Sequence, residues 1–155
     1  MGQARLLRHV DLEPEVDFFG LCLQDADLGQ VPVPYPGERV MEGFLTAHQG
    51  RVDLHSAGHT HTAVMRAEVW DGEPPADASR VWDETGETQL HCVTGSLQVW
   101  GVTCGPILDE IPLGAVDRDW QVRVYCAGRA EVERVTRDEG IAEGIETYLV
   151  QFWPR

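Results

Sequence analysis

Four histidines lie close together in the first half of the sequence. His59 and His61 are separated by one residue, and His48 and His55 precede them. Histidine is the commonest metal ligand and also titrates near neutral pH. On a strand, residues i and i+2 point to the same face, so His59 and His61 can offer two imidazoles to one divalent metal. His91 would complete such a site only if folding brings it near.

This H-x-H pair resembles the first metal-binding motif of the cupins, but the remainder of that motif is absent. A cupin carboxylate is expected three or four residues later, whereas the next carboxylate here is Glu68. Gly58 places the pair near a turn, so a solvated polar loop is the competing interpretation. A metal-dependent, cupin-like enzyme or small-molecule binder that uses His59 and His61 is the alternative function.

Carboxylates are the second group of residues with a chemical implication. The 155 residues include 26 Asp+Glu against 12 Lys+Arg, all of them arginine, which gives a formal net charge of -14. Such a chain is not expected to bind a nucleic-acid backbone or an anionic membrane through general electrostatics. A basic protein is the expected partner, and an ordinary solvated acidic surface is the simpler alternative.

A group of these acids surrounds a tryptophan between positions 71 and 87. Tryptophan is enriched at binding hot spots, and carboxylates beside it would attract a basic partner. Packing in the core is the competing role for the tryptophan. The predicted partner-binding residues are Asp71, Glu73, Trp82, Asp83, Glu84 and Glu87.

Familiar catalytic motifs are missing from the sequence. It contains no G-x-S-x-G, no H-E-x-x-H and no P-loop, so we expect a protein that is not an enzyme and needs no cofactor. The four cysteines lie far apart without a C-x-x-C pair, and three of them stand in apolar segments. We therefore expect structural thiols rather than a disulfide or a metal set.

Short segments with period-two alternation predict strands. The Gly95-Ser96 pair predicts a hairpin turn between the strands Gln89–Thr94 and Leu97–Val102. The expected strands are Phe18–Leu23, Gly50–Leu54, Ala63–Trp70, Gln89–Thr94, Leu97–Val102, Trp120–Cys126 and Thr147–Trp153.

Other segments predict a helix or loops. The best helix candidate is Asp138–Thr147, although its two glycines weaken it. Loops are expected over Asp27–Gly37, Asp71–Ser79 and Gly105–Gly114, where glycine and proline are frequent. The whole pattern predicts an all-β fold, an antiparallel β-sandwich of roughly seven or more strands with little helix.

Length and composition favour one domain over residues 1–155. The sequence has no apolar run long enough for a membrane helix, and its first residues do not resemble a secretory signal. We therefore expect a cytoplasmic protein.

The order of the strand-like segments resembles the competence protein J family, whose named activity is inhibition of a DNA-entry nuclease. The resemblance spans about Val16 to Pro154. It is carried by Asp17–Leu21, Trp82–Leu90, Gly95–Val99, Trp120–Tyr125 and Tyr148–Pro154.

The resemblance implies a small cytoplasmic β-sandwich that acts by binding another protein. Together with the acidic composition, it favours a non-catalytic inhibitor or immunity-type protein that neutralises a basic nuclease or toxin. A structural module within a larger assembly is a third, weaker hypothesis.

Overall fold

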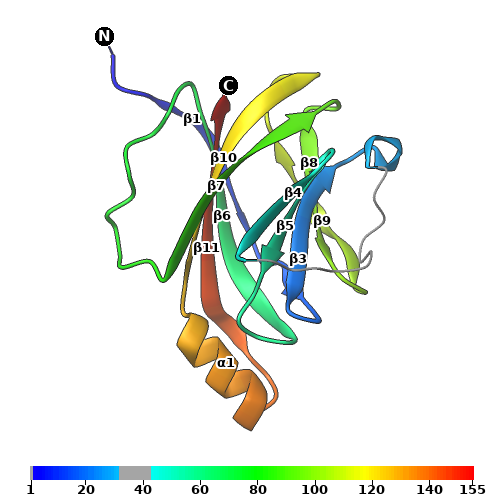
Figure 1. Cartoon of the computed structure of the whole chain (residues 1–155), viewed down its shortest axis with the longest axis vertical. Helices are drawn as coiled ribbons and strands as arrows, with labels where there is room; N and C mark the ends of the chain where they lie inside the picture. The colour runs from blue at the N-terminus through cyan, green and yellow to red at the C-terminus, as the bar shows by residue number, and fades with distance from the viewer. Residues whose placement is uncertain (1, 32–42) are drawn as a thin grey trace.

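The computed structural model describes residues 2–31 and 43–155, and most of the described backbone forms strands in two sheets (Figure 1). The first sheet contains β1 (Leu6–Leu12), β2 (Glu15–Val16), β6 (His61–Trp70), β7 (Glu84–Cys92), β10 (Arg118–Ala127) and β11 (Glu143–Pro154). The second contains β3 (Gly20–Asp25), β4 (Leu45–His48), β5 (Arg51–His55), β8 (Ser96–Gly101) and β9 (Gly105–Pro112). A 3-10 turn, η1 (Leu28–Gln30), and a helix, α1 (Arg129–Asp138), complete the elements.

The two sheets lie face to face, which confirms the predicted all-β sandwich. The first has the order β1-β6-β11-β10-β7, with β2 also paired to β6, and the second has the order β4-β5-β3-β8-β9. The second sheet is antiparallel throughout. The first is mixed rather than purely antiparallel, because β11 runs parallel to β6.

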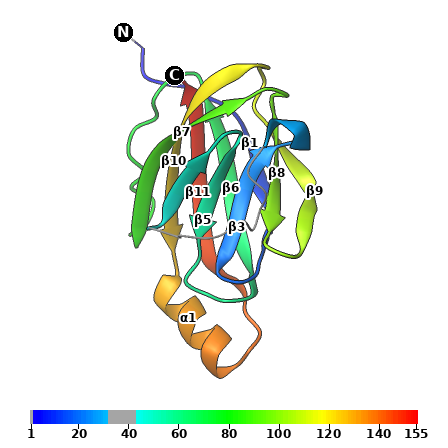
Figure 2. The ribbon, with the colours of Figure 1, turned by 45° about the vertical axis from the view of Figure 1, so that its right-hand side comes forward.

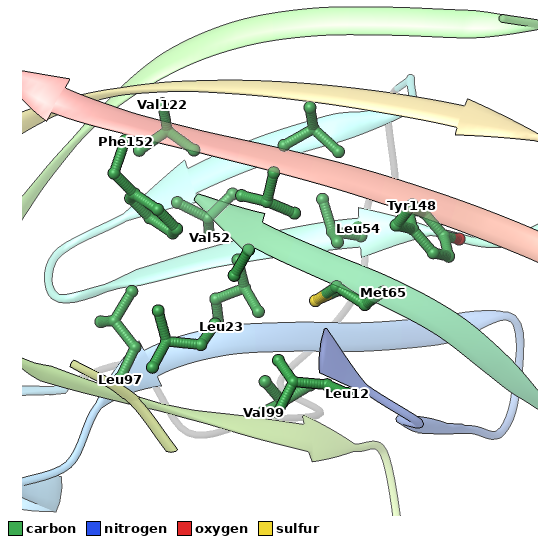
Figure 3. Close-up of a cluster of buried hydrophobic side chains, with 14 of the residues drawn as sticks. Leu12, Leu23, Val52, Leu54, Met65, Leu97, Val99, Val122, Tyr148 and Phe152 are labelled. Atoms are coloured by element: carbon green, nitrogen blue, oxygen red, sulfur yellow. The ribbon is translucent and has the colours of Figure 1, made fainter. Parts of the chain in front are cut away.

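The core fills the space between the sheets and follows the period-two alternation of the strands. On β10, Trp120, Val122 and Val124 are buried, as the alternation predicts. Figure 3 shows side chains of the second sheet meeting those of the first. The contributors labelled there are Leu23, Val52, Leu54, Leu97 and Val99 from one sheet and Leu12, Met65, Val122, Tyr148 and Phe152 from the other.

The predicted Gly95-Ser96 hairpin is wrong, because the turn joins two different sheets. β7 pairs with β10, whereas β8 pairs with β3 and β9. Gly95 has a positive φ of 78°, so the local turn signal is real. The turn therefore carries the chain from one layer of the sandwich to the other.

Two further sequence expectations need correction. The helix lies at Arg129–Asp138, and most of the predicted segment Asp138–Thr147 is a connection and the start of β11. Val132 and Val135, three residues apart, are buried against the sandwich, whereas Gly140 has a φ of 88° that cannot continue a helix. Most of the predicted loop Gly105–Gly114 is the edge strand β9.

The predicted loop Asp71–Ser79 is irregular, as expected, whereas the loop Asp27–Gly37 falls partly outside the described residues. The four cysteines are free, as predicted, and three of them are buried. Across residues 2–31 and 43–155, no helix combines the length and the apolar character needed to cross a bilayer.

Candidate functional site

The predicted partner-binding acids lie on the loop between β6 and β7 and on β7 itself. Asp71 and Glu73 begin the loop, and their side chains are 41% and 67% exposed. Asp71 accepts a hydrogen bond of 2.7 Å from the backbone N–H of Arg5. The Glu73 carboxylate lies 3.8 Å from a guanidinium nitrogen of Arg123. Both acids are accessible, but each already has a cationic neighbour.

Trp82 and Asp83 make contacts within the molecule. The Trp82 ring packs at 5.3 Å from the ring of Tyr125, and its Nε1 donates a hydrogen bond to Asp77. Asp83 accepts a hydrogen bond of 3.2 Å from the backbone N–H of Arg129, the first residue of α1. A negative charge at a helix N-terminus is favourable, so Asp83 also stabilises the helix.

Glu84 and Glu87 occupy β7, which is an edge strand. Three positions separate them, so their side chains leave opposite faces of the strand. Glu87 lies 3.4 Å from Arg123, on the same outer face as Glu73. The structure therefore gathers Glu73 and Glu87 around one arginine and leaves Glu84 exposed on the other face.

His59 and His61 do not share a site. β6 begins at His61, so His59 precedes the strand and the i, i+2 alternation does not apply to the pair. His61 is buried, and its Nε2 lies 2.8 Å from the hydroxyl of Ser56. His59 is exposed, with its ring 5.0 Å from the rings of Phe18 and Phe19.

The structure therefore does not favour the metal-site alternative, and the buried His61 does not belong to a solvated loop. Within the described parts of the chain, no three His, Cys, Asp or Glu side chains are arranged to hold a metal ion. His48 pairs with Asp53 at 3.1 Å, and His91 is held between Asp117 and Asp119.

A buried carboxylate, Glu146 on β11, organises the loop that carries His59. It accepts hydrogen bonds of 2.6 Å from both the Ser56 and Tyr148 hydroxyls and one of 3.0 Å from the Ala57 N–H.

Burial lowers the pKa of His61, and Glu146 opposes that effect. Burial also raises the pKa of Tyr148 well above its usual value, so burial favours the neutral forms of both His61 and Tyr148.

Sequence reasoning missed two neighbouring features at the end of the sandwich near α1. Phe18 and Phe19 are 47% and 40% exposed, and the strand predicted from Phe18 begins at Gly20 instead. A cleft of about 330 Å³ lies between β2 and the segment that enters β11, and Val16, two residues before Phe18, lines it. Asp17 and Gly20, which flank the two phenylalanines, are residue types favoured in turns, so a turn signal was available in the sequence.

The fold and these surfaces define a two-sheet β-sandwich with exposed carboxylates along the β6–β7 connection and β7, and with an exposed aromatic turn. No protein-family model matches the chain, and no curated protein matches it in sequence. Among solved structures, it is similar to ComJ from Bacillus subtilis, an inhibitor of the DNA-degrading activity of NucA. That likeness has a TM-score of 0.62, 11% sequence identity, and covers 99% of this chain and 100% of ComJ.

A second similar structure is described as crocagin biosynthetic gene J. It has a TM-score of 0.61 and 12% identity, and the match covers 96% of this chain and 97% of that one. At these identities the likeness concerns the fold. The distant resemblance to the competence protein J family, predicted from the strand pattern, is confirmed at that level.

Proposed function

We propose that this chain is a non-catalytic inhibitor that binds a basic partner protein, such as a nuclease or a toxin. The observation that carries the proposal is the match to ComJ over the full length of both chains. The formal net charge of -14 supports a basic partner, because complementary charge speeds association and selects among partners. We further propose that the chain is one domain, that it works in the cytoplasm, and that neither nucleic acid nor membrane is its partner.

The proposed contact surface contains the exposed acids between positions 71 and 87. We call it the acidic edge and define it as Asp71, Glu73, Asp83, Glu84 and Glu87. Arg5 and Arg123 pair with three of these carboxylates. The edge therefore keeps an excess of negative charge that a partner's arginines and lysines can neutralise. Trp82 would contribute the part of its ring that is left exposed beside Tyr125.

The first experiment captures the partner from the native host's lysate on the immobilised chain. We expect a basic protein to bind at low salt and to be released at high salt, because salt screens exposed charge pairs. The released protein is then identified and assayed for degradation of plasmid DNA with and without added chain. Retention of no protein at either salt concentration would contradict the proposal.

Charge reversal tests the acidic edge. We expect Asp83→Arg/Glu84→Arg to slow association with the captured partner by about tenfold at low salt, because steering depends on charge. The matched control is Asp109→Arg/Glu110→Arg, which makes the same charge change on β9 of the other sheet. Equal association rates for the two variants would remove the edge from the interface.

A further inference from the structure

The exposed aromatic turn consists of Phe18, Phe19 and His59, and we call it the aromatic tip. Phe18 and Phe19 stand between β2 and β3, and His59 stands between β5 and β6. Both phenylalanine rings lie 5.0 Å from the His59 ring. Figure 2 shows that these connections and α1 lie at the same end of the molecule. A cluster of three partly exposed rings is unusual on a surface that is otherwise rich in charge.

The backbone of the tip is strained and firmly held. Phe18 and Phe19 have φ angles of 49° and 61°, a left-handed conformation that bulky residues rarely adopt. The Phe19 N–H donates to the carbonyl of His59, and the Ser56 N–H donates to the carbonyl of Phe19. Strain of this kind persists only where the surroundings enforce it, and it concentrates at functional sites. The tip is therefore preorganised for contact.

Asp17 and Glu146 hold the tip from two sides. The Asp17 carboxylate accepts hydrogen bonds from the backbone N–H groups of Val102 and Thr103, which fixes the turn before Phe18. Glu146 holds the loop that carries His59 through Ser56 and Ala57. A rigid apolar group loses little conformational entropy on binding, which favours its use as an anchor.

The neighbouring cleft has an acidic rim. Glu15 on β2 and Glu143 on β11 both pair with Thr62 of β6, one from each side. Side chains of residues directly opposite one another leave the same face of a sheet, so the two carboxylates flank Thr62. Both are exposed, and within residues 2–31 and 43–155 neither has an arginine or histidine partner within ion-pair distance.

His61 and Cys104 also line the cleft, and their burial and charged neighbours describe the environment inside it. The His61 side chain is fully buried, yet its Nδ1 has no hydrogen-bond partner among the described residues. Burial, followed by the charges of Asp17 and Glu15, raises the pKa of Cys104 to about 11. The lining of the cleft thus combines the exposed carboxylates of Glu15 and Glu143 with a buried histidine whose Nδ1 has no partner among the described residues.

The cleft and the tip are continuous along the chain. Thr60 lines the cleft, and its hydroxyl lies 2.7 Å from Nδ1 of His59 in the tip. Asp17, which fixes the tip, also contacts the segment that leads to Cys104. We propose that the aromatic tip and the acidic cleft form one docking surface for a protein partner that places an arginine side chain in the cleft and apolar surface on the tip.

Arginine fits this surface for two reasons. Its planar guanidinium carries five N–H donors, which can bridge two separated carboxylates. Its aliphatic stem is itself apolar, so an arginine can lead from an acidic cleft to apolar surface such as the tip. That the partner is a protein rests on the proposed function. That the cleft binds a guanidinium group is independent of it.

The test is an NMR titration of the full chain with N-acetyl-arginine N-methylamide, and the citrulline analogue serves as the uncharged probe. We expect saturable shifts of the amide signals of Thr60, Thr62 and Glu143 with the arginine probe. Binding of the citrulline probe should be at least tenfold weaker. Equal shifts from both probes, or no shifts at these amides, would overturn the proposal.

Variants separate this inference from the proposed function. Glu15→Gln/Glu143→Gln should abolish binding of the arginine probe, whereas Glu84→Gln/Glu87→Gln, which removes the same charge from β7, should retain it. If the first variant still binds the probe as the original chain does, the cleft is not the site. Capture of an enzyme whose inhibition is unchanged in that variant would leave the proposed function intact and reject the docking surface.

Discussion

At the scale of single residues, buried polar groups explain how the exposed ones are positioned. Glu146 is fully buried and is stabilised by two hydroxyl donors and one backbone N–H. Arg129 adds a guanidinium nitrogen at 3.7 Å. A buried carboxylate without such partners would be strongly unfavourable, so this network is required for the loop conformation that presents His59.

We expect Glu146→Gln to lower the free energy of unfolding by about 1–3 kcal/mol. Both carboxylate oxygens accept from donors, so in either orientation the amide NH₂ would face a donor group that then loses its acceptor. Urea unfolding measures the change. Tyr148→Phe is the control, because it removes one donor and leaves the carboxylate, and it should cost only about 1 kcal/mol. A Glu146→Gln variant as stable as the original chain would contradict this account.

His91 provides a pH-dependent contact at the surface. Hydrogen bonds to Asp119 at 2.7 Å and to Asp117 at 2.9 Å raise its pKa above the usual 6.5. The folded-state pKa is the higher one, so the contact stabilises the fold fully below pH 6.5. That stabilisation is lost as the pH rises through the raised pKa.

We expect Asp119→Asn to lower the pKa of His91, as measured by NMR titration. The variant should melt below the original chain at pH values under 6.5 and converge with it at alkaline pH. His91→Gln should remove the pH dependence of this difference. A difference in melting temperature that grows with rising pH would have the opposite sign and would reject the assignment.

At the scale of elements, the sequence predicts strands better than it predicts their partners. The apolar face of each segment predicts the strands Trp120–Cys126 and Thr147–Trp153, which lie within β10 and β11. The Gly95-Ser96 pair predicts a turn because turn chemistry is local, whereas the sheet that the next strand joins depends on contacts far along the chain. Helix α1 was missed because it buries only Val132 and Val135.

The turn at Gly95, which carries the chain from one sheet to the other, allows a test by substitution. An added Cβ would lie 2.6 Å from the carbonyl oxygen of Ala115, in addition to the strain of a left-handed φ. Gly105 has nearly the same φ, with nothing within 4 Å of the added atom. We expect Gly105→Ala to cost about 1–2 kcal/mol from φ alone. Gly95→Ala should cost about 1–3 kcal/mol more because of the clash. Equal unfolding free energies would show that the crossing tolerates the extra atom.

At the scale of the whole molecule, composition predicted a surface but not a site. The acids of the acidic edge are exposed, yet folding brings Arg123 between Glu73 and Glu87 and packs Trp82 on Tyr125. Those partners lie 36 to 50 positions away in the sequence, so no local pattern could reveal them. The cleft could not be predicted for the same reason, because Glu15 and Glu143 are far apart in the sequence and are brought together by pairing with Thr62 of β6.

Charge complementarity at this scale predicts a dependence on salt. We expect the affinity for a basic partner to fall by about tenfold or more as ionic strength rises about tenfold, since the exposed acids are screened over shorter distances. Most of the change should appear in the association rate, which stopped-flow or surface-based kinetics can measure. An affinity that is constant across this range would indicate an interface dominated by apolar contacts.

The most direct test of the inhibitor proposal is a titration of inhibition. The enzyme released from the immobilised chain by salt is mixed with increasing amounts of the purified chain, and degradation of plasmid DNA is followed. The account predicts that activity falls to its minimum near one chain per enzyme molecule, and that Asp83→Arg/Glu84→Arg requires a larger amount. Full DNA degradation in the presence of excess chain would contradict it.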